Sequence, residues 1–145
     1  MANFTADNFT QPVYNGAYGN KSVAYAELAA IGTLAAGDTI DLLKLPGGAR
    51  VLSGRIIIAT AITTATLAVG IKYADGTSTG GTTGTAVMSG TGCALTTALA
   101  PQQLNFQSFV NDVDTVIYAT APNIAAAGAN TKLTVEVDYI AEGTK

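Results

Sequence analysis

Apolar and polar side chains alternate with a period of two along most of this chain, and this pattern limits its fold more strongly than any other feature. The clearest case lies near the C-terminus, over residues 133–140. Its apolar members are Leu133, Val135, Val137 and Tyr139, and the polar residues between them are Thr134, Glu136 and Asp138. Because successive side chains of a strand point to opposite faces, the pattern predicts an antiparallel strand with one buried face and one solvated face.

Five further segments are expected to be strands, by the same period or by their content of β-branched residues. They are residues 23–31, 40–45, 51–60, 65–73 and 115–119. The segment 51–60 contains Ile56, Ile57 and Ile58 in succession, which predicts a central strand with both faces covered. No segment has the amphipathic pattern of a helix of ten or more residues.

The length of 145 residues suits one domain, which at this size hides roughly 68–70% of the surface of its extended chain. Residues 75–100 are rich in Gly and Thr, and we expect a loop there with a short strand at 86–88. Leu104, Phe106 and Phe109 are expected near the core or at a subunit contact. The sequence therefore predicts an all-β, single-domain antiparallel β-sandwich or jelly roll over residues 22–145.

Residues 1–21 differ from the rest and are expected to form an extended N-terminal arm. Four aromatic residues in it, Phe4, Phe9, Tyr14 and Tyr18, are separated by Asn, Thr, Gly and Gln with neither helical nor strand periodicity. Such a segment cannot form a core alone, but its rings provide apolar area at low entropic cost when they lie on another surface. The arm is expected to dock on a partner subunit, to pack on its own domain or to be disordered.

The stretch KLPGGARVLSG, residues 44–54, is either a phosphate-binding loop or a corner between two strands. A phosphate-binding loop leads into the N-terminus of a helix, whereas here the glycines are followed by strand sequence. Pro46 suits the second position of a turn, with Gly47 supplying positive φ after it, so we predict a corner. Arg50 then begins a strand, where it either pairs with Asp38 or Asp41, is solvated, or reaches a carboxylate of a neighbouring subunit.

Charged residues make up only 12% of the chain, against about 25% in an average soluble domain. Small neutral side chains must cover the outside, and such a surface loses its water easily against another protein. We read this as a surface for assembly; a monomeric Thr-rich β-protein is the alternative.

The net charge of −3 and the scattered Lys and Arg predict no nucleic-acid partner. The sequence has neither a signal peptide nor a run of about 18 apolar residues, so we expect synthesis in the cytoplasm and no membrane contact.

Histidine is absent from the sequence, which removes the commonest general base, the triads that depend on it and most catalytic zinc sites. Two carboxylate pairs remain. Asp112 and Asp114 lack the further oxygen ligands of a calcium loop, and Glu136 and Asp138 lie on an expected solvated face. The glycine-rich stretches 80–85 and 90–95 lack the lysine or the third glycine of nucleotide-binding loops. We therefore predict no enzyme: no catalytic residues, no cofactor and no metal.

Three segments together resemble a known family. They read DTIDLLKLPGGARVLSGRIII, TATLAVGIKYADGT and KLTVEVDYIAEG, and the resemblance covers roughly residues 38–76 and 129–142. The family is that of the head decoration, or cement, proteins of tailed bacteriophages. It implies a β-sandwich or jelly roll that binds the outside of an icosahedral head, often as a trimer, and ties neighbouring capsomers together.

The resemblance implies two partners, the major capsid protein and further copies of this chain, most often in a homotrimer. It places the protein on the outer capsid surface of the virion, after synthesis in the cytoplasm of the host bacterium. Such families share no catalytic residues, so no site is carried over from them. From the sequence itself, the expected partner contacts are Phe4, Phe9, Tyr14, Tyr18 and Arg50.

Two other classes of function are alternatives to capsid decoration. A receptor- or carbohydrate-binding module of a phage tail or fibre would use the same kind of fold. The chain has no Trp, however, and most aromatics of its strands are expected on inward faces. A hydrolase that uses carboxylates alone is the third reading, and it depends on Asp112 or Asp114.

Overall fold

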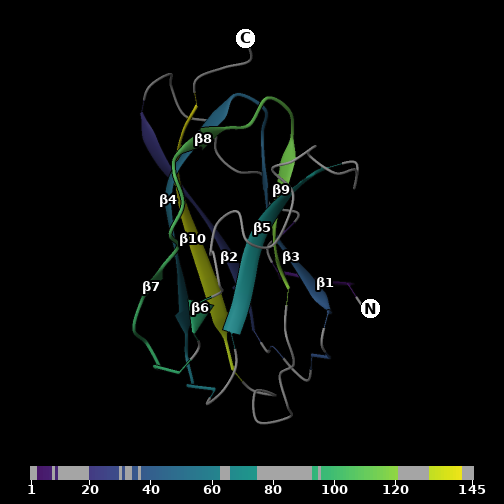
Figure 1. The fold of residues 1–145 in the computed structure, drawn as a ribbon, viewed down its shortest axis with the longest axis vertical. Coiled ribbons are helices and arrows are strands. Elements are labelled where there is room, and N and C mark those ends of the chain that lie inside the picture. The colour runs from purple at the N-terminus through teal and green to yellow at the C-terminus, as the bar shows by residue number, and fades with distance from the viewer. Residues whose placement is uncertain are drawn as a thin grey trace.

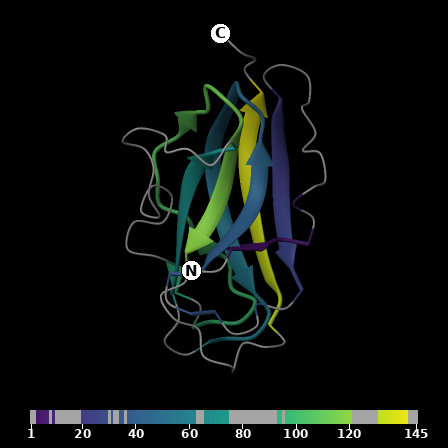
Figure 2. The same cartoon turned by 90° about the vertical axis from the view of Figure 1, so that its right-hand side faces the viewer.

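A computed structural model describes residues 3–7, 9, 20–29, 31, 34–35, 37–62, 66–74, 93–94, 96–120 and 131–141. These residues form two β-sheets that face each other (Figures 1 and 2). The predicted antiparallel β-sandwich is therefore confirmed. The expected strand at 86–88 lies outside the described residues.

One of the two sheets, which we call sheet B, has two inner strands, and the second half of the sequence supplies one of them. Its order is β2 (Lys21–Leu28), β10 (Leu133–Ala141), β4 (Ala49–Ile58) and β7 (Gln102–Gln103), and β8 (Phe109–Val110) also pairs with β4. Strand β10 is antiparallel to both β2 and β4. The alternation predicted for β10 is confirmed, because Leu133, Val135, Val137 and Tyr139 are all at most 1% exposed.

The other sheet, sheet A, has the order β1, β3, β9, β5, β6. These strands span Asn3–Thr5, Thr39–Leu45, Thr115–Thr120, Thr66–Tyr73 and Cys93–Ala94. Strand β1 is parallel to β3, and the other neighbours are antiparallel. The inward face of β5 carries Leu67, Val69 and Ile71, which are buried as the sequence predicts.

Apolar side chains from both sheets fill the space between them. The largest fully buried side chains are Tyr139, Leu34, Ile40, Leu42, Leu45, Ile56, Ile58, Leu67 and Ile117. Strand β4 is central, as expected, but Ile57 is only half buried, so the prediction that both of its faces are covered is correct only in part. Ile57 lies on the outward face, where no further layer is present among the described residues.

The segment LPGG forms the predicted corner, and it joins the two sheets rather than two neighbours of one sheet. Strand β3 ends at Leu45 in sheet A, and β4 begins at Ala49 in sheet B. The positive φ of this turn is at Gly48 (79°), so the sequence-based assignment to Gly47 is wrong. Gly47 is needed for a different reason, because a Cβ there would lie 3.1 Å from the backbone of Asp112 and Val113.

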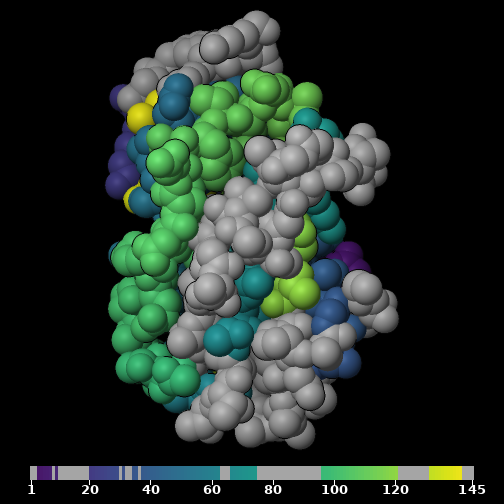
Figure 3. Space-filling model, viewed as in Figure 1, coloured from purple at the N-terminus to yellow at the C-terminus, as the bar shows by residue number. Residues whose placement is uncertain are grey.

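Residues 96–110 line the edge of sheet B that lies away from β2, and the space-filling view shows them as a continuous green strip (Figure 3). Leu104 is buried, and Phe106 and Phe109 pack against the core with their ring centroids 5.7 Å apart. The expectation that these three residues lie near the core is confirmed. They cover the edge of β4 that would otherwise be open to another strand.

The start of the chain closes the opposite side of the sandwich. Strand β1 adds to the edge of β3, and Figure 2 shows it crossing from there towards β2. Ala6 N–H donates to Asp41 O at 2.8 Å, and Asp7 N–H donates to Glu27 O of β2 at 2.7 Å. We call residues 3–7 the strap, because they connect the edge strands of the two sheets.

Candidate interaction surfaces

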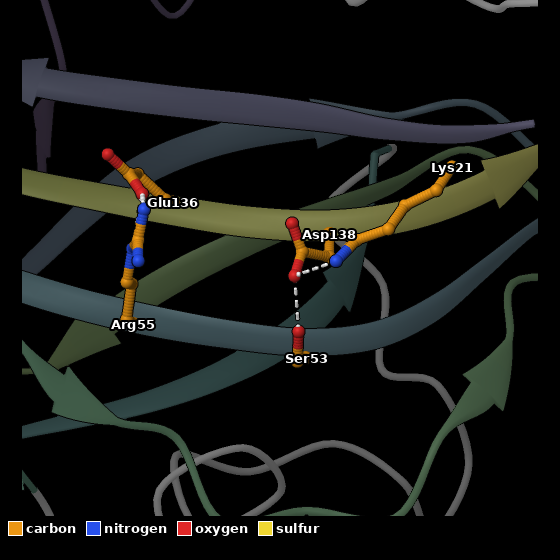
Figure 4. A network of polar contacts seen from close by, with 5 residues as sticks. All are labelled: Lys21, Ser53, Arg55, Glu136 and Asp138. Atoms are coloured by element: carbon orange, nitrogen blue, oxygen red, sulfur yellow. Dashed lines mark hydrogen bonds and ion pairs between the residues drawn. The ribbon is translucent and has the colours of Figure 1, made fainter.

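The outward face of sheet B carries a network of ion pairs and hydrogen bonds (Figure 4). Asp138 of β10 lies opposite Ser53 of β4 in the antiparallel register. Ser53 Oγ donates to Asp138 Oδ2 at 2.6 Å, and Lys21 Nζ of β2 lies 2.9 Å from the same oxygen. Three strands are thereby connected through one carboxylate.

The surroundings of Asp138 favour its ionised form. Partial burial alone would raise the pKa of this carboxyl, but the hydrogen bonds from Ser53 and Lys21 and the positive charges of Lys21 and Arg55 outweigh it. The pKa of Asp138 therefore lies below its ordinary value. This carboxylate is therefore charged at neutral pH.

A second pair extends the network along the same strands. Arg55 and Glu136 are direct cross-strand neighbours, and the guanidinium donates to Glu136 Oε2. Because Glu136 lies two residues before Asp138, both carboxylates project from the same face of β10. The expectation that this pair lies on an outward strand face is confirmed by the structure.

These residues border a shallow hollow of roughly 200 Å³. It is lined by Lys21, Ser53, Gly54, Arg55, Gln103, Glu136 and Asp138. Its charged groups are already paired with one another, so the hollow offers a polar surface of balanced charge. Such a surface suits hydrogen bonds and bridging waters to another protein better than the binding of an ion.

Two exposed apolar side chains adjoin this network on β2. Val23 is 58% exposed and Tyr25 is 51% exposed, and in the register they lie opposite Asp138 and Glu136. Tyr is enriched among the residues that dominate binding energy in protein interfaces, and a satisfied polar rim around apolar anchors is typical of such interfaces. We call Val23, Tyr25 and the residues of the network the sheet B face.

The outward face of sheet A is organised around Lys72. Its ammonium lies 2.6 Å from Asp41 Oδ1 and 5.4 Å from the ring centroid of Tyr118. The pKa of the Tyr118 phenol is raised, first by burial and then by the negative charge of Asp41. Asn3 of the strap donates to Asp41 Oδ2 at 3.1 Å and accepts from Thr39 Oγ1 at 2.8 Å.

Ion pairs within the chain account for nearly all positive charge in the described part of the sequence. Besides the pairs of Lys21, Arg55 and Lys72, Lys44 pairs with Asp114 at 3.1 Å and Lys132 with Glu27 at 2.7 Å. Arg50 is also engaged. No patch of unpaired cations is therefore found among the described residues, and a polyanion would have little to bind.

The described residues among the predicted partner contacts lie on different elements of the fold. Phe4 lies in β1 and is 38% exposed, whereas Phe9 is half buried against the core. Tyr14 and Tyr18 lie outside the described residues. Arg50 is on β4 of sheet B, between Ile140 and Val110, whereas Asp41 on sheet A is bound by Lys72 and Asn3.

Sequence reasoning missed the strap and the sheet B face. Asn3, Asp7 and Asp41 are far apart in the sequence, and no local pattern indicates that they meet. Val23 and Tyr25 alternate with Ala24 and Ala26 in β2, but because Ala is small, this alternation did not indicate which face was outward. The two carboxylates on β10 were recognised, whereas their partners Lys21, Ser53 and Arg55 were not.

The carboxylates of Asp112 and Asp114 differ in their surroundings. Asp112 is exposed, and Asp114 accepts a hydrogen bond from Gly47 N–H at 3.0 Å and pairs with Lys44. The bond from Gly47, with that from Lys44, lowers the pKa of Asp114.

Among the described residues there is no cluster of three metal-ligating side chains, and no helix long and apolar enough to cross a membrane.

Solved structures that share this fold include chains from three phage capsids. A chain of the capsid of Ralstonia phage GP4 superimposes with a TM-score of 0.73 and 20% identity, over 99% of this chain and 100% of that one. A chain of the capsid asymmetric unit of cyanophage Pam1 has a TM-score of 0.57 and 26% identity, over 88% and 89% of the two chains. For the acid-stable capsid of Helicobacter pylori bacteriophage KHP30 the values are 0.52 and 18%, over 87% and 91%.

No protein-family model matches the sequence, and no curated protein does. The likeness is therefore one of structure. The chain has the fold of these proteins from phage capsids.

Proposed function

We propose that this chain is a decoration protein, which binds the outside of a phage head and ties major capsid proteins together. The observation that carries the proposal is the end-to-end superposition on a chain of the Ralstonia phage GP4 capsid. Because that match covers both chains almost completely, the capsid component it identifies has about the size of this chain. A capsid thus contains a separate sandwich of this size, not merely a similar domain within a larger shell subunit.

The pairing of charges supports a position on the outer surface. A protein that lines the inside of a filled head faces packaged nucleic acid and would gain from unpaired cations. Here five of the six Lys and Arg residues in the described part of the chain are paired with carboxylates of the same chain, and the net charge of the whole sequence is −3. These features favour contact with protein over contact with the packaged genome.

The sheet B face is the surface that we assign to the capsid. Val23 and Tyr25 supply apolar area at its edge, worth about 25 cal/mol for each Å² removed from water. The network around Asp138 supplies polar groups whose partners are already in place, so little ordering is required on binding. Ordered polar groups beside an exposed Tyr are a suitable basis for a specific contact.

Multivalency turns this modest contact into firm attachment. When several copies form one oligomer, of which a trimer is the expected size, the first contact raises the effective concentration for the others. The shell then ruptures only when several contacts fail together. No catalysis is needed for this role.

The test is co-sedimentation of purified protein with heads that lack it, prepared from the phage that encodes it. We expect saturable binding and heads that withstand higher temperature before they release their DNA. Replacing Val23 and Tyr25 by Ser should weaken binding about tenfold or more. Val113→Ser is the matched control, since Val113 is also exposed (48%) but lies on the loop beside Gly47. This variant should bind heads as tightly as the unmodified chain.

Two results would count against the proposal. If the protein fails to sediment with such heads at any concentration while remaining folded, it is not a decoration protein. If it instead binds defined sugars on a glycan array, the receptor-binding alternative gains support. Equal loss of binding in the Val113 control would remove the assignment of the sheet B face but not the role on the capsid.

A further inference from the structure

The strap is attached to the sandwich by hydrogen bonds more than by apolar burial. Asn3, Phe4, Thr5 and Asp7 are all exposed, and of residues 3–7 only Ala6 is buried, at 5% exposed. Its pairing with β3 is parallel and three residues long. Elements with few buried apolar contacts and exposed hydrogen bonds open most easily in a folded protein.

The site that receives the strap, which we call the strap site, consists of strands that are also paired with other strands. They are β2 and β3, each paired on its other side within its own sheet. Asp41, which accepts from Asn3 Nδ2, is held by Lys72 of β5 at 2.6 Å. On the β2 side, Glu27 O accepts from Asp7 N–H, and Ala29 N–H donates to the Asp7 carboxylate at 2.6 Å.

The donors and acceptors of the strap site therefore recognise a short extended peptide rather than a particular chain. A strand with Asn at its first position and Ala-Asp at its fourth and fifth satisfies Thr39, Asp41, Glu27 and Ala29 whichever copy provides it. This is strand addition at a sheet edge, in which backbone bonds give affinity and side-chain contacts give register.

The sequence also gives the strap enough reach. Eleven residues separate Phe9 from Lys21, where β2 begins. A chain of that length spans up to roughly 40 Å when extended. That is enough to carry the strap to an adjacent subunit when two copies lie side by side.

We propose that in the assembled state the strap of one copy occupies the strap site, on the edges of β2 and β3, of a neighbouring copy. This exchange rests on the proposed function, because it requires copies held close together, and it identifies the surface by which they are linked. Exchange of an identical element needs no new interface chemistry, since every contact of the closed monomer is made again between copies. It adds a chain-to-chain link to each capsid contact.

The experiment uses cysteines placed at one register pair. Asn3 and Thr39 are partners in the β1–β3 pairing, and their side chains are hydrogen-bonded, so cysteines at both positions can form a disulfide. One full-length chain carries Asn3→Cys and another Thr39→Cys, each with Cys93→Ser. The two are mixed, bound to heads, oxidised and separated on a non-reducing gel. We expect a covalent heterodimer in a large share of the chains, because a strap bound within its own chain cannot link them.

A second register pair protects the test against damage to the strap. Thr5→Cys with Asp41→Cys keeps Asn3 in place and probes the same pairing. The control pair is Ile57→Cys with Thr134→Cys, which are opposite each other on β4 and β10 inside sheet B. Carried on one chain, the control pair must give monomers; split between two chains, it must give no heterodimer.

The outcomes separate this inference from the proposed function. If chains bind heads but both strap pairs, carried on one chain, cross-link only within that chain, and the split pairs give no heterodimer, strap exchange is wrong and the decoration role stands. If the chains do not bind heads, the decoration role fails. A heterodimer that forms in free oligomers as well as on heads supports exchange independently of the capsid.

Discussion

Lys72 of β5 and Asp41 of β3 form an ion pair across the intervening strand β9, with 2.6 Å between Nζ and Oδ1. Tyr118 of β9 lies beneath the ammonium, 5.4 Å from Nζ to the ring centroid. The pair therefore fastens three strands and, through Asn3, the strap. Its side chains are only 26% and 14% exposed, in contrast to the pair of Lys44 and Asp114 at 50% and 54%.

Lys72→Met should lower the free energy of unfolding by about 1–2 kcal/mol, because it leaves a largely buried carboxylate with fewer partners and removes the contact with the Tyr118 ring. Lys44→Met removes the same charge from an exposed pair and should cost less than about 0.5 kcal/mol. Urea denaturation followed by circular dichroism measures both. Equal losses in the two variants would show that the Lys72 pair has no special role.

Ala6→Asn should destabilise the protein by roughly 1–3 kcal/mol, because it places an amide without partners and a larger side chain at a position that is 5% exposed. Thr5→Asn introduces the same residue one position earlier, on an exposed site, and should change stability by less than about 0.5 kcal/mol. The comparison tests whether the strap is seated as described. If both variants unfold at the same urea concentration as the unmodified chain, the strap does not contribute to the fold.

Most of the fold follows from the sequence because a period of two is a direct consequence of strand geometry. The segment 133–140 was readable for this reason, since every second side chain faces the core and is apolar. The corner at Pro46 was equally readable, because Pro and Gly restrict the backbone locally. The positive φ was nevertheless predicted for Gly47 instead of Gly48, because either of two adjacent glycines can adopt the left-handed conformation in a turn.

The candidate surfaces were far less predictable. An ion pair such as Lys72 with Asp41 depends on the order of strands in a sheet, which local patterns do not contain. The sequence predicts an arm over residues 1–21, but composition alone could not show that Ala6 is buried while Phe4 is 38% exposed. A small side chain such as Ala6 fits where the edges of two sheets come together, but patterns of apolar and polar residues do not distinguish such a position from an exposed one.

Acid should destabilise the folded chain in part through Asp138 and Asp114, whose pKa values are lowered. A carboxyl with a lower pKa in the folded state contributes stability that is present above its ordinary pKa of 3.8 and is lost as the pH falls through the folded value. Stability should therefore decline from about pH 4 downwards. Ser53→Ala removes a bond that favours the ionised form, so the pKa of Asp138 should rise in a carbon-detected NMR titration, whereas that of Asp114 should not change.

Alkali should act through Tyr139, which is fully buried. Burial raises the pKa of its phenol, and this effect outweighs the opposite effect of a hydrogen bond with Ser22. A raised pKa in the folded state gives stability that is complete below the ordinary value of 10.0 and is lost as the pH rises through the folded value. Tyr139→Phe should thus reduce the loss of stability above pH 10, measured by urea denaturation at stepped pH. An unchanged alkaline profile in that variant would assign the loss to other groups.

The corner between the sheets offers the last prediction. Gly48 has a φ of 79°, a conformation that is costly for residues with a Cβ, so Gly48→Ala should destabilise the fold by about 1–2 kcal/mol. Gly48→Asn should cost less than Gly48→Ala if backbone conformation is the main restriction, because Asn adopts positive φ more readily. Gly47→Ala should also destabilise, but through its close approach to Asp112 and Val113, and Gly47→Asn should be no better than Gly47→Ala. The same order of Ala and Asn at both positions in thermal denaturation would contradict the separate roles assigned to these two glycines.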